Sequence, residues 1–73
     1  MKVKYILETA YLYKMNNGKK TYIPANELVY EPLIFIPDQR KQDPFDLAMK
    51  MRCDLMKDPV FNDRYIRIVE YQG

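Results

Sequence analysis

The first part of the chain alternates between apolar and polar positions with the period of a β-strand. From Val3 to Met15 the odd positions carry apolar or aromatic side chains, apart from Thr9, whereas the even positions are mixed. Successive side chains of a strand point to opposite faces, so this alternation predicts one long strand over 3–15 with one buried face.

A tight turn is predicted directly after this strand. Asn16-Asn17-Gly18 follows it, and an Asn-Gly pair supplies the positive φ angles that two-residue hairpin turns need. We therefore expect residues 19–23 to return as a second strand, with Tyr22 opposite the tyrosines of the first. Pro24 ends this strand, because proline cannot donate a hydrogen bond to a neighbouring strand.

Two further strands are predicted from the remaining apolar segments. Leu33-Ile34-Phe35-Ile36 is uniformly apolar, which predicts a short buried strand after a bend at Pro32. A polar loop follows over 37–42. Residues 65–71 alternate but carry large side chains on both faces, which is typical of a central strand rather than an edge strand.

One helix is marked at both ends by its sequence. Asp43 is a good N-cap, Pro44 suits the first turn, and Asp46 favours the positive end of the helix dipole. The helix is predicted to run to about residue 57, because Asp58-Pro59 stops it.

The helical wheel predicts an apolar face with two irregularities. Arg52 falls within the apolar stripe, and three interpretations are open for it. Its stem lies over the edge of the core with the guanidinium in solvent, or it pairs with a sheet carboxylate such as Glu8 or Glu70, or it is exposed and anchors a partner. Leu47 falls on the polar side, which makes it a second candidate anchor. The residues that share the apolar face are Phe45, Ala48, Met49, Met51, Leu55 and Met56.

The order of these elements predicts the fold class. Strand, strand, short third strand, helix and strand, a β-β-(β)-α-β order, indicate a single α+β domain over residues 1–73. We expect a small antiparallel sheet of three to four strands with one helix packed on one face, which leaves the other face open. A chain of this length buries only about 60% of its unfolded surface, so its core is thin.

The composition argues against catalysis. The chain has no histidine and no serine, so it lacks the usual proton shuttle and the serine nucleophile. Its two glycines, Gly18 and Gly73, cannot form a phosphate-binding loop. Cys53 is the single cysteine, and without a nearby pair of basic residues or a helix N-terminus to activate it, it is interpreted as a packed or semi-exposed structural thiol. We therefore predict that the protein is not an enzyme and binds no cofactor.

No metal site is predicted either. One cysteine without histidine cannot make a four-ligand zinc site. Asp38, Asp43 and Asp46 could approach a divalent ion, but helix capping already accounts for two of these carboxylates. A solvated loop followed by a helix cap is therefore the interpretation we adopt for this segment.

The seven tyrosines of the chain predict that it functions by binding another molecule. Tyrosine is large, nearly rigid and amphipathic, and tyrosine and arginine are enriched at protein interfaces. Some of the seven are expected to complete the core, and those left on the open sheet face would form a protein-binding patch. The residues that we assign to this patch are Tyr11, Tyr13, Tyr22, Tyr30 and Arg67, with Lys19 and Lys20 at the hairpin.

Two other functions would use the same side chains. Tyrosines could stack on the bases of a single-stranded nucleic acid, although the net charge of only +2 counts against this. A homo-oligomer could instead bury the tyrosines or an exposed strand edge. The side chains that would hold phosphates in the first case are Lys4, Lys14, Lys19, Lys20 and Arg67, and the acidic residues that oppose it are Glu8, Glu27, Glu31 and Glu70.

The sequence also predicts a location. No stretch approaches the roughly 18 apolar residues of a membrane span, and no apolar leader segment follows Met1-Lys2. A single thiol is compatible with a reducing compartment. We therefore expect a cytoplasmic protein that does not associate with membranes.

Three segments resemble a layout found in small bacteriophage proteins. They are the helix entry Asp43-Pro44-Phe45-Asp46, the helix exit Lys57-Asp58-Pro59 and the terminal Tyr65-Ile66-Arg67-Ile68-Val69-Glu70. The shared layout is a hairpin, a helix and a closing strand, and some proteins with it inhibit host enzymes, including one that blocks bacterial RNA polymerase. The resemblance implies a phage-encoded modulator or inhibitor of a host or defence protein, acting in the host cytoplasm.

Overall fold

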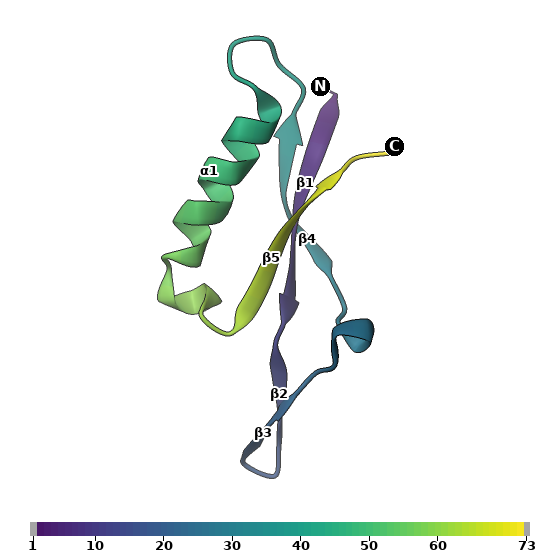
Figure 1. The fold of residues 1–73 in the computed structure, drawn as a ribbon, viewed down its shortest axis with the longest axis vertical. Helices are drawn as coiled ribbons and strands as arrows, with labels where there is room; N and C mark the ends of the chain where they lie inside the picture. The colour runs from purple at the N-terminus through teal and green to yellow at the C-terminus, as the bar shows by residue number, and fades with distance from the viewer. Residues whose placement is uncertain (1, 73) are drawn as a thin grey trace.

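A three-stranded antiparallel sheet with one helix against it forms the body of the molecule (Figure 1). The computed structural model describes residues 2–72. The helix is α1 (Pro44–Met56), and two single-turn 3₁₀-helices are η1 (Ala25–Glu27) and η2 (Pro59–Phe61). The strands are β1 (Val3–Tyr11), β2 (Tyr13–Asn16), β3 (Lys19–Tyr22), β4 (Glu31–Pro37) and β5 (Arg64–Glu70). The predicted α+β class, with a helix on one face of an antiparallel sheet, is confirmed.

The first strand lies in the centre of the sheet. The strand order is β4-β1-β5, and Leu7 of β1 pairs with Ile34 on one side and Ile68 on the other. The prediction that residues 65–71 form a central strand is therefore wrong, because β5 is an edge strand. Large side chains on both faces of a strand indicate how each face is covered. They do not indicate whether the strand is hydrogen-bonded to a neighbour along each of its two edges.

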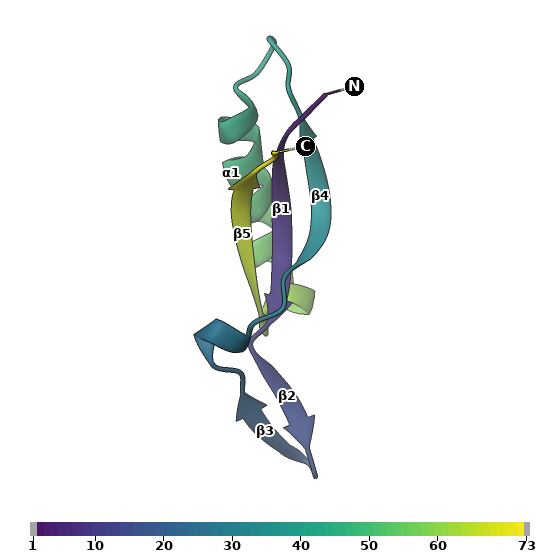
Figure 2. The ribbon, with the colours of Figure 1, turned by 90° about the vertical axis from the view of Figure 1, so that its right-hand side faces the viewer.

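The predicted single strand over 3–15 is interrupted at Leu12. The Leu12 N–H donates to the Asp63 carbonyl at 3.0 Å, and the Leu12 carbonyl accepts from the Ile23 N–H at 2.8 Å. These two bonds turn the chain out of the sheet, and β2 and β3 then form a separate two-stranded ribbon. Figures 1 and 2 show this ribbon extending beyond the end of the sheet where β5 begins. We call residues 13–22 the hairpin arm.

The turn of the hairpin arm follows its sequence prediction. Asn17 and Gly18 have φ angles of 53° and 78°, as a two-residue turn between antiparallel strands requires. This turn places Asn16 opposite Lys19 and Tyr13 opposite Tyr22. The predicted meeting of Tyr22 with a tyrosine of the first strand is confirmed.

The core lies between α1 and one face of the sheet. Its fully buried members are Leu7, Ile36, Ala48 and Ile66, one from each strand of the sheet and one from the helix. Ala48 has no exposed surface, and its short side chain allows the helix to lie close to the sheet. The side chains that pack around this centre are Tyr5, Ile34, Leu47, Met51, Leu55, Phe61 and Ile68.

The helix begins as predicted but presents a rotated face. Its N-cap, Asp43, accepts a hydrogen bond from the Phe45 N–H at 2.9 Å. Leu47, predicted on the polar side, packs against the core in one row with Met51 and Leu55. The predicted face also included Phe45, Met49 and Met56, which are 45%, 40% and 49% exposed. Ala48 belongs to both the predicted and the observed face, so the rotation replaces Phe45, Met49 and Met56 by Leu47 at the core.

Arg52 contacts the edge of the sheet as a result of this rotation. Its Nε donates to the Ile66 carbonyl of β5 at 2.8 Å, and the side chain is half-buried. The expected carboxylate partner is not Glu8, which pairs with Arg67, nor Glu70, which pairs with Lys4. Arg52 thus satisfies a backbone acceptor on an edge strand.

Within residues 2–72, no helix has the length and apolar character needed to cross a bilayer.

Candidate protein-binding surfaces

The sheet face that points away from α1 is the first candidate surface. Phe35, Ile6 and Val69 lie side by side across β4, β1 and β5. Glu8 with Arg67, and Ala10 with Tyr65, occupy the next positions along the same face. The alternate positions of these strands pack against the helix. We call this surface the open face, and its members are Ile6, Glu8, Phe35, Tyr65, Arg67 and Val69.

Aromatic side chains on the open face are accessible. Phe35 and Tyr65 are 54% and 53% exposed and lie on the two outer strands, with Ile6 and Val69 half-buried between and beside them. Phe35 falls within the segment that the sequence predicted to be a buried strand, and its exposure corrects that prediction. The correction has a simple cause: only one face of the sheet is covered by the helix, so a uniformly apolar strand must leave alternate side chains exposed.

Arg67 is held in place at the middle of the open face. Its Nε and Nη2 contact one carboxylate oxygen of Glu8, Oε1, at 2.9 and 2.8 Å. Its guanidinium carbon lies 3.6 Å from the centre of the Tyr30 ring, which is cation–π contact. The Arg67 side chain remains 49% exposed. The structure therefore brings together Tyr30 and Arg67, two of the residues assigned to the binding patch.

Tyr11 lies elsewhere. It lies at the end of β1, opposite Arg64 of β5. Because side chains alternate along a strand, Tyr11 is on the other face of the sheet from Ile6 and Glu8. The Arg64 guanidinium carbon lies 4.4 Å from the Tyr11 ring centre and 5.2 Å from the Phe61 ring centre. Tyr11 is still 52% exposed, so it covers Arg64 from one side rather than filling the core.

The hairpin arm carries the second candidate surface. The Tyr13 and Tyr22 rings meet edge to face, with centres 5.9 Å apart, and the Lys20 ammonium lies 4.8 Å from the Tyr13 ring centre. Lys19, the remaining predicted patch residue, is exposed at the end of the arm beside the turn. An open groove of about 410 Å³ separates the arm from η2, and its lining residues are Leu12, Tyr13, Lys20, Tyr22, Pro59, Val60, Asn62 and Asp63.

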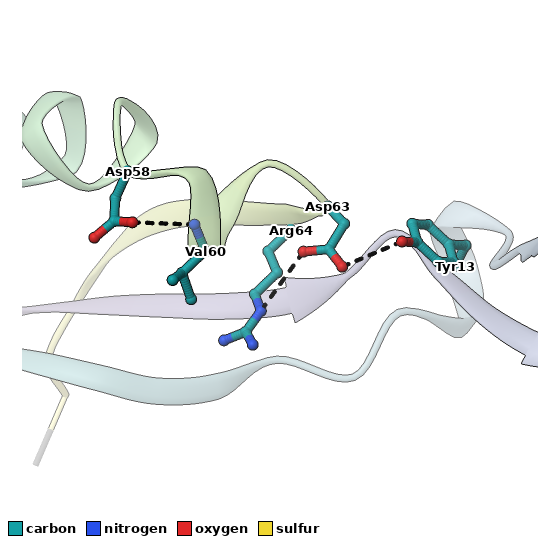
Figure 3. Close-up of polar contacts among 5 residues, drawn as sticks. All are labelled: Tyr13, Asp58, Val60, Asp63 and Arg64. Atoms are coloured by element: carbon teal, nitrogen blue, oxygen red, sulfur yellow. Dashed lines mark hydrogen bonds and ion pairs between the residues drawn. The ribbon is translucent and has the colours of Figure 1, made fainter.

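Asp63 connects the hairpin arm to the body (Figure 3). Its Oδ2 accepts a hydrogen bond from the Tyr13 hydroxyl at 3.3 Å. Its Oδ1 lies 3.9 Å from Arg64 Nε, which is an ion pair but too long for a hydrogen bond. A second carboxylate, Asp58, caps η2 by accepting from the Val60 N–H at 3.0 Å. This cap fixes the wall of the groove on which Val60 is 60% exposed.

Each outer strand of the three-stranded sheet carries features that hinder pairing with another strand at single positions. Pro32 and Pro37 remove two N–H donors from β4. On β5, the Ile66 carbonyl is occupied by Arg52. Unpaired edges are the usual route to strand addition, and these features limit it.

No metal cluster is formed by the part of the chain that the structure describes. Between residues 2 and 72, no three Asp, Glu, Cys or His side chains come together as a metal ion requires. Asp43 is used as the helix cap, and Cys53 is exposed. Both candidate surfaces present aromatic, apolar and charged side chains.

Four surface residues were missed by the sequence reasoning. Phe35 and Tyr65 could have been found by asking which apolar side chains one helix cannot cover. Asp63 and Val60 gave no such signal, because their role depends on a chain bend at Leu12 that only the folded structure reveals.

Comparisons of this chain with protein-family models, with curated proteins and with solved structures found no match.

Proposed function

We propose that this chain is a protein-binding module that holds its partner against the open face. The observation that carries the proposal is the pair of exposed aromatic side chains, Phe35 and Tyr65, on either side of a guanidinium that Glu8 and Tyr30 hold in place. Aromatic residues and arginine supply most of the binding energy at protein interfaces. A side chain that is already ordered loses less entropy when a partner binds.

The proposed partner is a host or defence protein. This part of the proposal is supported by the resemblance of the helix boundaries and the last strand to small bacteriophage proteins. Occupation of a partner surface, rather than chemistry, is then the mode of action, and the chain acts as a modulator or inhibitor in the host cytoplasm. A second copy of the chain is the competing occupant of the same face.

Affinity capture from a lysate of the natural host, treated with nuclease, tests the proposal. The open-face variant is Phe35→Ser with Tyr65→Ser. The matched control is Met49→Ser with Met56→Ser, which removes apolar side chains of similar exposure from α1. We expect a protein that is retained by the wild type and the helix control but lost by the open-face variant.

Two results would contradict the proposal. One is retention of the captured protein by an open-face variant that is still folded by circular dichroism. The other is a wild-type dimer, seen by sedimentation at several concentrations, that the open-face variant alone abolishes, because the occupant would then be a second copy of the chain.

A further inference from the structure

The net positive charge of this protein comes from the hairpin arm. Residues 13–22 contain three lysines, Lys14, Lys19 and Lys20, and no Asp or Glu. The whole chain carries a net charge of +2, so the residues outside the arm sum to −1. A projecting element that holds all of the excess positive charge attracts an acidic partner to one end of the molecule.

The two faces of the arm differ in character. Strand pairing places Tyr13, Tyr22, Met15 and Lys20 on one face, and Lys14, Thr21, Asn16 and Lys19 on the other. The first face includes the groove residues Tyr13, Lys20 and Tyr22. Tyr22 and Val60, on opposite walls of this groove, are 70% and 60% exposed. A groove of mixed polar and apolar lining, with exposed apolar surface at Tyr22 and Val60, thus lies beside a lysine whose ammonium is 4.8 Å from the Tyr13 ring centre.

We infer that this groove binds an acidic peptide segment that carries an aromatic side chain. The aromatic side chain would lie between Tyr22 and Val60, where the exposed apolar surface of both walls would be buried. Carboxylates that flank it would approach Lys20 on the groove side and Lys14 and Lys19 on the outer side. The apolar contact supplies affinity, and the charges supply orientation and a faster encounter.

A nucleic acid is the weaker match to the same surface. The carboxylate of Asp63 lines the groove beside Tyr13, where it would repel any phosphate or carboxylate that entered the groove itself. Three lysines would also release few counterions, which corresponds to a salt slope of only about −2 for a single strand. An acidic peptide can turn its carboxylates toward the lysines and its aromatic side chain toward the groove, whereas a phosphate backbone presents charge along its entire length.

This inference goes beyond the proposed function, because it assigns a ligand chemistry to a surface that is separate from the open face. It does not depend on the open face having a partner. Variants of the arm leave Phe35 and Tyr65 unchanged, so failure of either proposal is distinguishable from failure of the other.

An NMR titration of the full chain with a defined peptide tests the inference. The probe is a short peptide of glutamates flanking one central phenylalanine, and the comparison peptide has alanine at the centre. We expect amide shifts confined to the hairpin arm and to η2, with binding of the alanine peptide about tenfold weaker because the buried aromatic surface is lost. Tyr22→Ala should reduce binding of the phenylalanine peptide to the level of the alanine peptide.

Charge variants separate the site from general electrostatic attraction. Lys19→Glu with Lys20→Glu should weaken binding about tenfold, through loss of two close charge pairs and the repulsion that replaces them. Lys41→Glu with Lys50→Glu changes the net charge equally but lies in the loop before α1 and on α1, and it should weaken binding less than twofold. Melting curves establish that both variants are folded.

Three outcomes would overturn the inference. The first is an equal loss of binding in the two charge variants, which would indicate non-specific attraction. The second is the absence of amide shifts in the arm and η2 at millimolar peptide in low salt. The third is tighter binding of a thymidine oligonucleotide than of the phenylalanine peptide at the same ionic strength, which would assign the arm to nucleic acid instead.

Discussion

The guanidinium carbon of Arg67 lies 3.6 Å from the centre of the Tyr30 ring, although 36 residues separate the two positions in the chain. Tyr30 precedes β4 on one edge of the sheet and Arg67 belongs to β5 on the other edge, with Glu8 of β1 between the two strands. The contact therefore spans the full width of the open face. It joins the outer parts of the sheet in addition to fixing the side chain at its centre.

A double-mutant cycle should detect this contact as coupling. Arg67→Ala and Tyr30→Leu are each expected to lower the free energy of unfolding, and the pair should show a coupling of about 0.5–1 kcal/mol, as cation–π contacts at exposed sites do. Urea denaturation of the four proteins measures it. Tyr71→Leu, combined with Arg67→Ala, serves as the control pair and should give additive losses. A coupling of zero for Tyr30 would show that the stacked arrangement is not maintained in solution.

Removal of Arg52 should destabilise the edge of the sheet. Arg52→Ala leaves the Ile66 carbonyl without its donor and should lower the free energy of unfolding by about 1.5 kcal/mol. Lys50→Ala, on the same helix but exposed, should change it by less than about 0.5 kcal/mol. The freed edge of β5 should also promote association, which size-exclusion chromatography at rising concentration detects. Equal stabilities of the two variants would argue that Arg52 merely extends along the surface.

Asp63 should couple the hairpin arm to the body. Asp63→Ala removes the Tyr13 hydrogen bond and the Arg64 ion pair together, and a loss of about 1–2 kcal/mol in the free energy of unfolding is expected. Asp63→Asn keeps an oxygen that can accept from Tyr13 but loses the charge, so it should cost about half as much. NMR shifts of Tyr13 and Tyr22 should move in the alanine variant. Unchanged shifts there would mean that other contacts orient the arm.

The turn of the hairpin arm should respond to backbone strain alone. Gly18 has a φ of 78°, and a Cβ at this position would meet no atom within 4 Å. Gly18→Ala should therefore weaken the arm by about 1 kcal/mol through its backbone conformation and not through a clash. Gly18→Asn, which tolerates positive φ better, should cost less. Amide hydrogen exchange should accelerate in residues 13–22 and remain unchanged at Leu7 and Ile66; faster exchange in the core would show that the arm and the body unfold as one unit.

Local signals in the sequence predicted the elements that depend on few residues. Asn17 and Gly18 specify a turn through their own φ angles, and that turn alone determines that Tyr13 faces Tyr22. Asp43 marks the helix start because its carboxylate can reach the Phe45 N–H two residues away. The pairing of aromatic side chains on the arm was predictable for this reason, and the register followed from the turn.

Features that depend on distant partners were not predictable in the same way. The bend at Leu12 depends on a hydrogen bond to the Asp63 carbonyl. The orientation of Leu47 toward the core depends on the sheet against which Ala48 packs. For the candidate surfaces, Tyr30 and Arg67 were both assigned to a binding patch, but nothing in their local sequence indicates that they touch. Their contact depends on the strand order β4-β1-β5, which alternation along one strand does not encode.

The central position of β1 has a consequence for synthesis of the protein on the ribosome. β1 precedes both of its sheet neighbours, β4 and β5, in the chain, and more than 50 residues lie between the end of β1 and the start of β5. Leu7 cannot be enclosed until residues 64–70 have left the ribosome, so the nascent chain carries an apolar strand with an unpaired edge while residues 12–63 are made. Such pairing between distant segments is slow and exposes the chain to aggregation. The hairpin arm, whose strands are adjacent in sequence, is the part that can form while the rest of the sheet waits for its final strand.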